Sequence, residues 1–151
     1  MIVVFYGQPS SGKTTLAKLP QERIFLQNQP TPVIIDGDEI RTIFKDTDYS
    51  KEGRTNNLRR ISDIAIFLES KYNLVIISAV YPIQASREYL DGMCNNVLWV
   101  HLFNVDFREK QEFHVKDFDL PYFEARKNCS INTTNFTPEM CIERILDYMS
   151  L

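Results

Sequence analysis

The chain has 151 residues, of which 44% are hydrophobic and 25% are charged, and its formal net charge is −3. This length suits a single domain over residues 1–151, and the composition is that of a globular protein rather than a disordered one. The slightly acidic balance argues against a general nucleic-acid binder, which usually carries a strongly basic face.

The cysteines and the N-terminal segment indicate the cellular compartment in which the protein is expected. Cys94, Cys129 and Cys141 share no metal-ligand spacing and are odd in number, so we expect reduced thiols in a cytoplasmic protein. The apolar run over 1–6 has no basic segment before it and stops at Gly7, which is too short for a signal peptide or a membrane span. We therefore expect no membrane partner.

Short apolar runs alternate with helical patterns along the chain. In chain order, the expected elements are strand 2–6, helix 13–19, strand 33–35, helix 54–71, strand 74–78, helix 84–93, strand 97–103 and a last helix that starts at Thr137 and Pro138. The strand runs are continuously apolar, which suits a parallel sheet covered on both faces. Alternation of this kind predicts a three-layer α/β fold.

Two features of this pattern are less regular. Pro20 follows the first helical stretch, and we expect it to end or kink that helix, because proline removes a backbone donor and clashes with the preceding turn. The stretch 104–135 fits neither a strand nor a helix pattern. We expect it to form a loop or lid.

A phosphate-binding motif lies between the first strand and the first helix. Residues 7–14 satisfy the Walker A pattern in full and in the context that it requires. Gly7 and Gly12 allow the backbone to turn successive amide N–H groups inward, Lys13 would contact the β- and γ-phosphates, and the Thr14 hydroxyl would bind Mg²⁺. We therefore predict an MgATP site whose cradle comprises Gly7, Ser10, Ser11, Gly12, Lys13, Thr14 and Thr15.

Two carboxylates, Asp36 and Asp38, follow the second expected strand and flank Gly37. Ligands of open α/β sheets bind beyond the carboxyl ends of the strands, so both acids would face the phosphate cradle. There they are suited to organise Mg²⁺ with its water and to accept a hydroxyl proton. The alternative is a surface turn followed by a helix that Asp38 caps.

With these motifs in place, the sequence resembles the adenylylsulfate kinase family. Residues 36–41 match the Asp-Gly-Asp-x-hydrophobic-Arg signature of that family, and residues 7–17 resemble its P-loop and first helix. Further resemblances follow in the family's order at 49–61, at 77–82 with Arg87, at 119–124 and at 131–148. The resemblance implies a P-loop kinase fold and phosphorylation of the 3′-hydroxyl of adenylyl sulfate by MgATP, a step of sulfate assimilation.

The resemblance also implies residue roles. Asp38 would be the general base at the acceptor hydroxyl, Asp36 would support the metal, and Lys13 would stabilise the transferring phosphoryl group. The acceptor would be bound by Arg41, Tyr49, Arg54, Asn57, Ser78 and Val80. The arginines and the asparagine would hold its anionic group and sugar, and Tyr49 would stack on its base. The alternatives are a core aromatic at Tyr49 and a simple strand-end hydroxyl at Ser78.

Three departures from the family fall on the acceptor side. Gly53 replaces a family aspartate, which we expect to loosen the start of the helix, and Tyr81 replaces a serine that is phosphorylated in some members. The family's Arg-Asp-x-Lys-Gly-Leu-Tyr lid is missing before Asp119. The residues that are candidates to replace it are Lys110, Phe113, His114 and Lys116.

These departures leave the acceptor open. It is either adenylyl sulfate or another nucleotide conjugate, such as a nucleoside diphosphoramidate of capsular polysaccharide synthesis. A third alternative is a nucleotide-binding protein with reduced catalysis. The expected partner is a small nucleotide-like molecule rather than a nucleic acid, and a homodimer is also left open.

Overall fold

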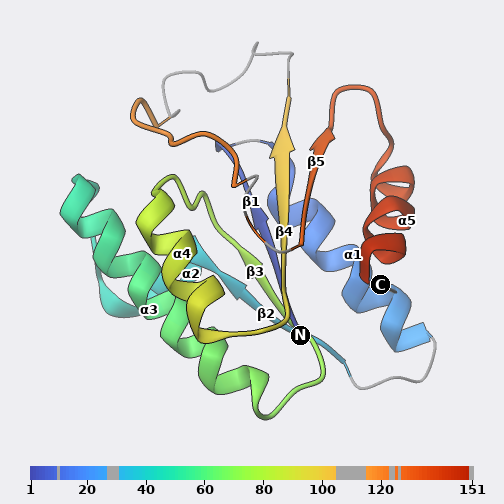
Figure 1. Cartoon of the computed structure of the whole chain (residues 1–151), viewed down its shortest axis with the longest axis horizontal. Coiled ribbons are helices and arrows are strands. Elements are labelled where there is room, and N and C mark those ends of the chain that lie inside the picture. The colour runs from blue at the N-terminus through green and yellow to red at the C-terminus, as the bar shows by residue number, and fades with distance from the viewer. Residues whose placement is uncertain (10, 27–30, 105–114, 123–124, 126, 150–151) are drawn as a thin grey trace.

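Five parallel strands form one sheet in the order β2-β3-β1-β4-β5 (Figure 1). They are β1 (Ile2–Tyr6), β2 (Val33–Asp36), β3 (Val75–Ser78), β4 (Val97–Phe103) and β5 (Asn128–Asn132). The computed structural model describes the whole chain except residues 10, 27–30, 105–114, 123–124, 126 and 150–151, and only the backbone at 20–26.

In the part of the chain that the structure describes, five helices cover the two faces of this sheet. They are α1 (Lys13–Leu26), α2 (Gly37–Phe44), α3 (Lys51–Glu69), α4 (Gln84–Met93) and α5 (Pro138–Met149). Helices α1 and α5 lie on one face, and α2, α3 and α4 lie on the other (Figure 1). Alternate side chains of β1 enter opposite cores, with Val4 on the α3 side and Phe5 on the α1 side. The predicted three-layer α/β fold is confirmed.

Four strands and the last helix follow the prediction closely, and two elements do not. The loop or lid expected over 104–135 is wrong for Asn128–Asn132, a short strand of mixed polarity that pairs with β4 along its whole length. Helix α1 does not end at Pro20 but continues to Leu26. Its packing against α5 and the sheet outweighs the local cost of the proline.

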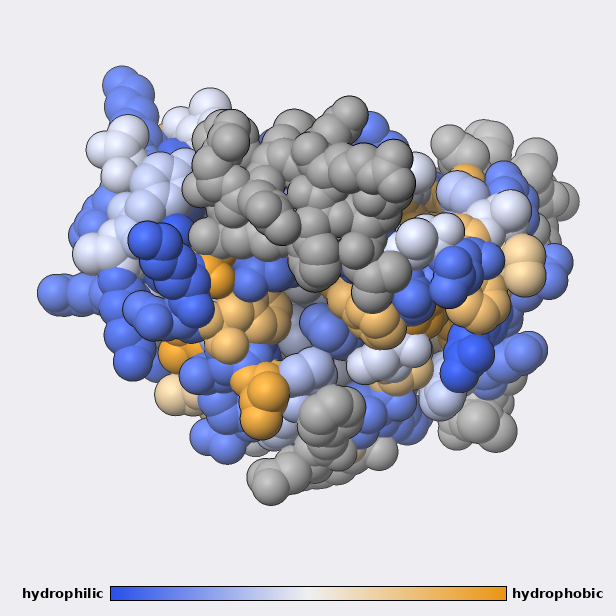
Figure 2. Space-filling model, turned by 90° about the horizontal axis from the view of Figure 1, so that it is seen from above, coloured by the Kyte–Doolittle hydropathy of each residue, from blue (hydrophilic) through white to orange (hydrophobic). Residues whose placement is uncertain are grey.

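The strand ends bring the predicted motifs to one edge of the sheet. Asp36, the last residue of β2, pairs in register with Ser78 of β3, and Ser78 pairs in turn with Phe5 of β1. The Walker A loop leaves β1 at this edge. Figure 2 looks down on it and shows hydrophilic and apolar side chains mixed around a hollow. Among the described residues, no helix has the length and apolar character needed to cross a bilayer.

Candidate active site

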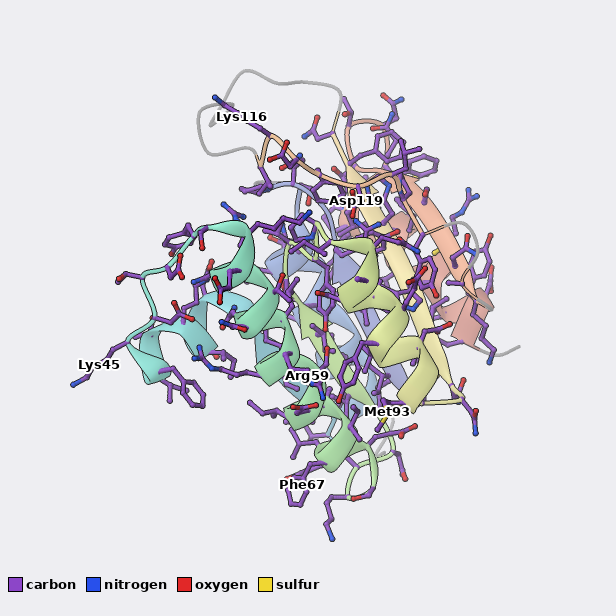
Figure 3. The ribbon with its side chains drawn as sticks, turned by 60° about the vertical axis from the view of Figure 1, so that its left-hand side comes forward. Lys45, Arg59, Phe67, Met93, Lys116 and Asp119 are labelled. Atoms are coloured by element: carbon purple, nitrogen blue, oxygen red, sulfur yellow. The ribbon has the colours of Figure 1, made fainter. Side chains whose placement is uncertain are left out.

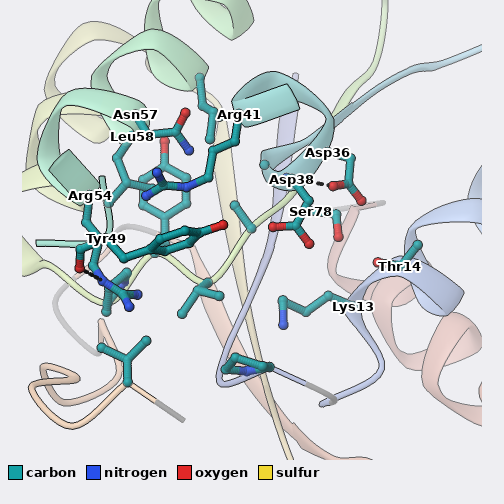
Figure 4. Close-up of a pocket in the computed structure, with 18 of the residues that line it drawn as sticks. Lys13, Thr14, Asp36, Asp38, Arg41, Tyr49, Arg54, Asn57, Leu58 and Ser78 are labelled. Carbon is teal, nitrogen blue, oxygen red and sulfur yellow. Dashed lines mark hydrogen bonds between the residues drawn. The ribbon is translucent and has the colours of Figure 1, made fainter. Parts of the chain in front are cut away.

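A cavity of about 1200 Å³ opens at the carboxyl edge of the sheet. It brings together most of the predicted residues in one space (Figure 4). Those that line it are Gly12, Lys13, Thr14, Thr15, Asp36, Asp38, Arg41, Tyr49, Arg54, Asn57, Ser78 and Val80. Gly7 and Ser11 belong to the loop but do not line the cavity, and Ser10 lies outside the described residues.

The phosphate loop is held in a conformation that its glycines permit. Gly7 has a φ of 153° and Gly12 a φ of 95°. A Cβ atom at Gly7 would collide with the carbonyl oxygen of Leu102 in β4, so only glycine fits there. The Gly7 amide donates to the Val80 carbonyl oxygen at 3.2 Å, which ties the loop after β1 to the loop after β3.

Lys13 is folded back onto this loop. Its Nζ donates to the Gln8 carbonyl oxygen at 2.8 Å and to the Ser11 hydroxyl at 3.4 Å. Burial lowers the pKa of the Lys13 ammonium to about 8, although the nearby carboxylates of Asp38 and Asp36 act in the opposite direction. The Lys13 ammonium therefore loses its proton at a pH not far above neutral.

This lowered pKa predicts that nucleotide affinity falls at alkaline pH. Below about pH 8 the Lys13 ammonium attracts phosphates, whereas above it the amine is neutral in the free protein and must take up a proton on binding. We expect the Kd of MgADP to rise up to about tenfold per pH unit above that point. Calorimetry in buffers of different ionisation enthalpy would detect the proton uptake. The Lys13→Arg variant, whose cation does not titrate there, should show neither effect, and a wild-type Kd that is constant from pH 7.5 to 9.5 would contradict the assignment.

The two carboxylates after β2 have different roles. The Asp36 Oδ1 atom accepts from the amides of Asp38 at 2.8 Å and Glu39 at 3.4 Å, so Asp36 is the N-cap of α2. The alternative that Asp38 caps this helix is wrong. The Asp38 side chain is exposed at the cavity and, among the described residues, has no hydrogen-bond or ion-pair partner (Figure 4). It is therefore free to meet a ligand.

Arg41 and Tyr49 lie against each other in the wall of the cavity. The Arg41 guanidinium is only 8% exposed, lies 3.3 Å from the Asp46 carboxylate, and donates to the Asp48 carbonyl oxygen at 2.9 Å. Its central carbon lies 4.2 Å from the centre of the Tyr49 ring. Tyr49 is 58% exposed, so the alternative of a core aromatic is wrong.

Arg54 is less engaged than Arg41. Its Nε donates to the Tyr49 carbonyl oxygen at 2.9 Å, and its terminal nitrogens have no hydrogen-bond or ion-pair partner in the part of the chain that the structure describes. Partial burial and the neighbouring Arg41 charge lower the pKa of the Arg54 guanidinium. A partly desolvated cation that faces a cavity, and that pairs with no carboxylate among the described residues, is suited to bind an anion.

Asn57 lies one turn further along α3, on the same face as Arg54, as their spacing predicts. It is 5% exposed, and its Oδ1 atom is buried without a hydrogen-bond partner among the described residues. Buried polar atoms are nearly always paired. This oxygen is therefore an unsatisfied acceptor of a residue that lines the cavity.

The glycine at position 53 is explained by Asp48. A Cβ atom at Gly53 would collide with the backbone oxygen and the side chain of Asp48, which occupies that space. Helix α3 begins at Lys51, and the Ser50 hydroxyl caps it by accepting from the Gly53 amide at 3.1 Å. The helix predicted from residue 54 therefore begins earlier, at Lys51.

Tyr81 differs in its surroundings, and not only in its side chain, from a serine that can be phosphorylated. It is fully buried, has a φ of 49°, and its hydroxyl is hydrogen-bonded to that of Ser62. Burial also raises its pKa far above the ordinary value. The neighbouring Ser78 is 4% exposed and lies beside Asp36 at the strand ends, where it lines the cavity rather than only ending a strand.

Sequence reasoning missed part of the cavity wall. The additional lining residues are Pro9, Gly37, Leu58, Ile61, Ala79, Tyr81, Pro82 and Val115. All of them except Val115 lie inside the motif and family segments 7–14, 36–41, 49–61 and 77–82, but most are apolar positions whose place in the wall depends on tertiary packing. Of the lid candidates, Lys116 is exposed, does not line the cavity and points outward (Figure 3). Lys110, Phe113 and His114 lie outside the described residues.

The chain resembles known proteins over most of its length. Residues 1–131 match the adenylylsulphate kinase family. The adenylyl-sulfate kinase of Pseudomonas aeruginosa is 25% identical over an alignment 167 positions long, which covers 98% of this chain and 84% of that protein. That of Thermodesulfovibrio yellowstonii is 31% identical over 88 residues, which cover 58% of this chain and 44% of the relative.

The fold has a solved counterpart. The Mycobacterium tuberculosis APS kinase CysC, determined in complex with AMPPNP and APS, superposes with a TM-score of 0.81 at 19% identity, over 99% of this chain and 97% of that one. At this identity the likeness concerns the fold, whereas the family match covers most of the sequence. The chain therefore belongs to the adenylylsulfate kinase family of P-loop kinases.

Proposed function

We propose that the protein transfers the γ-phosphoryl group of ATP to the 3′-hydroxyl of adenylyl sulfate or of a closely similar nucleotide conjugate. One observation carries this proposal. The unpaired carboxylate of Asp38 faces a cavity that has Lys13 at one end and Arg54 with Asn57 at the other (Figure 4). A phosphate site and a site for a second anion thus share one space, with a base between them.

The phosphate half supports binding of ATP with Mg²⁺. The loop amides and Lys13 would hold the phosphates and stabilise the charge that develops during transfer. Thr14 and Asp36 offer hard oxygen atoms of the kind that Mg²⁺ prefers. The described residues contain no group of three or more His, Cys, Asp or Glu side chains that could hold a metal ion, and we expect phosphate oxygens and water to complete the coordination shell.

The acceptor half supports activation of a hydroxyl group. Asp38 would take the proton of the acceptor hydroxyl as its oxygen forms a bond to the γ-phosphorus and the bond to the β-phosphate oxygen breaks. ADP would carry away the electron pair of the broken bond. Arg54 would bind the anionic group of the acceptor, the Asn57 oxygen would accept from one of its donors, and Tyr49 would contact its base.

A panel of acceptors tests this function. The protein is incubated with MgATP and, separately, adenylyl sulfate, a nucleoside diphosphoramidate and simple nucleoside monophosphates, and ADP formation is measured. We expect adenylyl sulfate to accelerate ADP release most. Faster ADP release with the nucleoside diphosphoramidate than with adenylyl sulfate would identify the phosphoramidate as the acceptor instead. Slow ATP hydrolysis that no acceptor changes would contradict a kinase function.

The cysteines bear on where this reaction takes place. Cys94, Cys129 and Cys141 are free and buried. Burial raises the pKa of each thiol, which keeps it in the unreactive protonated form. Three unpaired thiols suit a reducing compartment, and we propose the cytoplasm.

The Asn57→Leu variant should bind the acceptor more weakly although the free protein becomes more stable. Leucine is of similar size and removes the unpaired buried oxygen, whose desolvation costs about 1–3 kcal/mol. We therefore expect the free protein to become more stable by about 1 kcal/mol in thermal or urea unfolding, while the KM for the acceptor rises about tenfold because a hydrogen bond is lost. The Kd of MgADP should not change.

The neighbouring Asn56 provides the matched control. It lies on the exposed face of α3 and does not line the cavity. Asn56→Leu should therefore alter neither the acceptor KM nor, beyond about 0.5 kcal/mol, the stability. An Asn57→Leu variant that is less stable and binds the acceptor normally would show that this side chain has only a structural role.

A further inference from the structure

The chain bends across the top of the sheet over residues Val115–Tyr122, which we call the strap. The Asp119 carboxylate accepts from the Gln84 amide at 2.7 Å and so caps α4 from 35 positions away. The fully buried Arg87 donates to the carbonyl oxygens of Asp119 and Leu120. These contacts fix the middle of the strap to the frame of the fold, near the start of α4 (Figure 3).

The first residue of the strap is fixed differently, by the phosphate loop itself. The Gln8 Nε2 donates to the Val115 carbonyl oxygen at 3.0 Å, and the Val115 amide donates to the Gln8 Oε1 at 2.8 Å. The side-chain amide thus pairs with the backbone as a neighbouring strand would. Only asparagine and glutamine carry a donor and an acceptor in this arrangement.

Gln8 also contacts the group that binds phosphate. Its carbonyl oxygen accepts from the Lys13 Nζ at 2.8 Å. One residue therefore touches the phosphate-binding lysine through its backbone and the strap through its side chain. Any rearrangement of the loop around a nucleotide bears directly on Val115.

Val115 in turn belongs to the wall of the cavity. Among the described residues that follow Pro82, it is the one that lines this space, together with Tyr49, Arg54 and Asn57 from the acceptor half. The position of Val115 therefore contributes to the shape of the cavity. Gln8 holds this first residue of the strap through two hydrogen bonds, and among the described residues the next strap contacts are those of Phe118 and Asp119.

We propose that Gln8 is a positioning residue that couples the phosphate site to the acceptor site through Val115. This inference rests on the proposed function for the identity of the acceptor, but the coupling itself requires only a nucleotide. A nucleotide that orders the loop steadies Gln8, and Gln8 then holds Val115 in place as the wall of the second site. By linkage, an acceptor that packs against Val115 strengthens nucleotide binding by the same factor.

Hydrogen exchange of the Val115 amide tests the coupling without any acceptor. In the wild-type protein, saturating AMPPNP with Mg²⁺ should slow exchange of this amide about tenfold, the factor of one ordinary hydrogen bond. In Gln8→Leu, the amide should exchange faster than in the wild type and should not respond to the nucleotide. Gln84→Leu makes the same substitution at a residue whose side chain contacts Glu88 and Arg87 rather than the strap, and it should leave the response of Val115 intact.

The outcomes separate the coupling from the proposed function. A wild-type Val115 amide that ignores the nucleotide overturns the coupling, even if Gln8→Leu does not fold. Equal protection in the wild type and in a folded Gln8→Leu also overturns it. With adenylyl sulfate present, the Kd of AMPPNP should fall several-fold in the wild type and not in Gln8→Leu. If adenylyl sulfate does not bind at all, the proposed acceptor is wrong, and the exchange result alone decides the coupling.

Discussion

Asp38→Asn is expected to lower the rate of acceptor-dependent ADP formation by about 10²–10⁴-fold, the loss typical of a missing general base. Asparagine keeps the size of the side chain but cannot take up the proton of the acceptor hydroxyl. The fold should not be affected, because Asp36 rather than Asp38 caps α2. The measurement is kcat at saturating MgATP and acceptor, together with the Kd of MgADP, which should stay close to its wild-type value.

Two neighbouring acids supply the controls for this variant. Glu39→Gln removes one negative charge at the next residue, which is exposed and does not line the cavity, and it should leave kcat unchanged. Asp36→Asn keeps a capping side chain, since asparagine also caps helices, but it should raise the Mg²⁺ concentration that is needed for half-maximal activity. Near-normal turnover of Asp38→Asn would mean that another group accepts the proton.

The sequence predicts the phosphate half of the site well because its information is local. Residues 7–14 form a contiguous motif whose glycines, lysine and threonine act within one turn of chain between β1 and α1. The strands that carry the motif are continuous apolar runs, and the buried strand pattern of β1 follows directly from that composition. The motif and the hydrophobic pattern around it therefore predict the same local structure.

The parts that could not be predicted depend on contacts between distant segments. Gln8 and Val115 are 107 positions apart, and nothing in either segment alone indicates that they pair. From the sequence alone, Gly53 is only a replacement of the family's aspartate. In the structure, Asp48 occupies the space that a side chain at position 53 would need. Strand β5 has no apolar run, and its identity comes from pairing with β4.

The same limit applies to the two acceptor-side arginines. The family motif names both Arg41 and Arg54, but it does not say which of them has donors to spare. The acid that neutralises Arg41 is Asp46, which also lies 2.7 Å from the Arg60 guanidinium. Arg54 has no such partner among the described residues, so a ligand anion has most to gain from this side chain.

Arg54→Ala should therefore weaken acceptor binding strongly. A hydrogen bond to a charged group contributes about 1.5–3 kcal/mol, so we expect the acceptor KM to rise about 10- to 100-fold. The Kd of MgADP should not change, because Arg54 lies at the other end of the cavity from Lys13 (Figure 4). Arg54→Lys keeps the charge but loses the planar set of donors, and it should recover only part of the affinity.

Arg59→Ala is the matched control, since it removes the same charge from the same helix. Arg59 lies on the outer face of α3, where it pairs with Asp63 and covers the Tyr89 ring at 3.7 Å (Figure 3). A long-range effect of net charge would appear in both variants, whereas direct contact with the acceptor would appear only in Arg54→Ala. Equal losses of nucleotide and acceptor affinity in Arg54→Ala would show that its bond to the Tyr49 carbonyl supports the cavity wall instead. The separation of the two affinities is thus the property that distinguishes an anion ligand from a structural arginine.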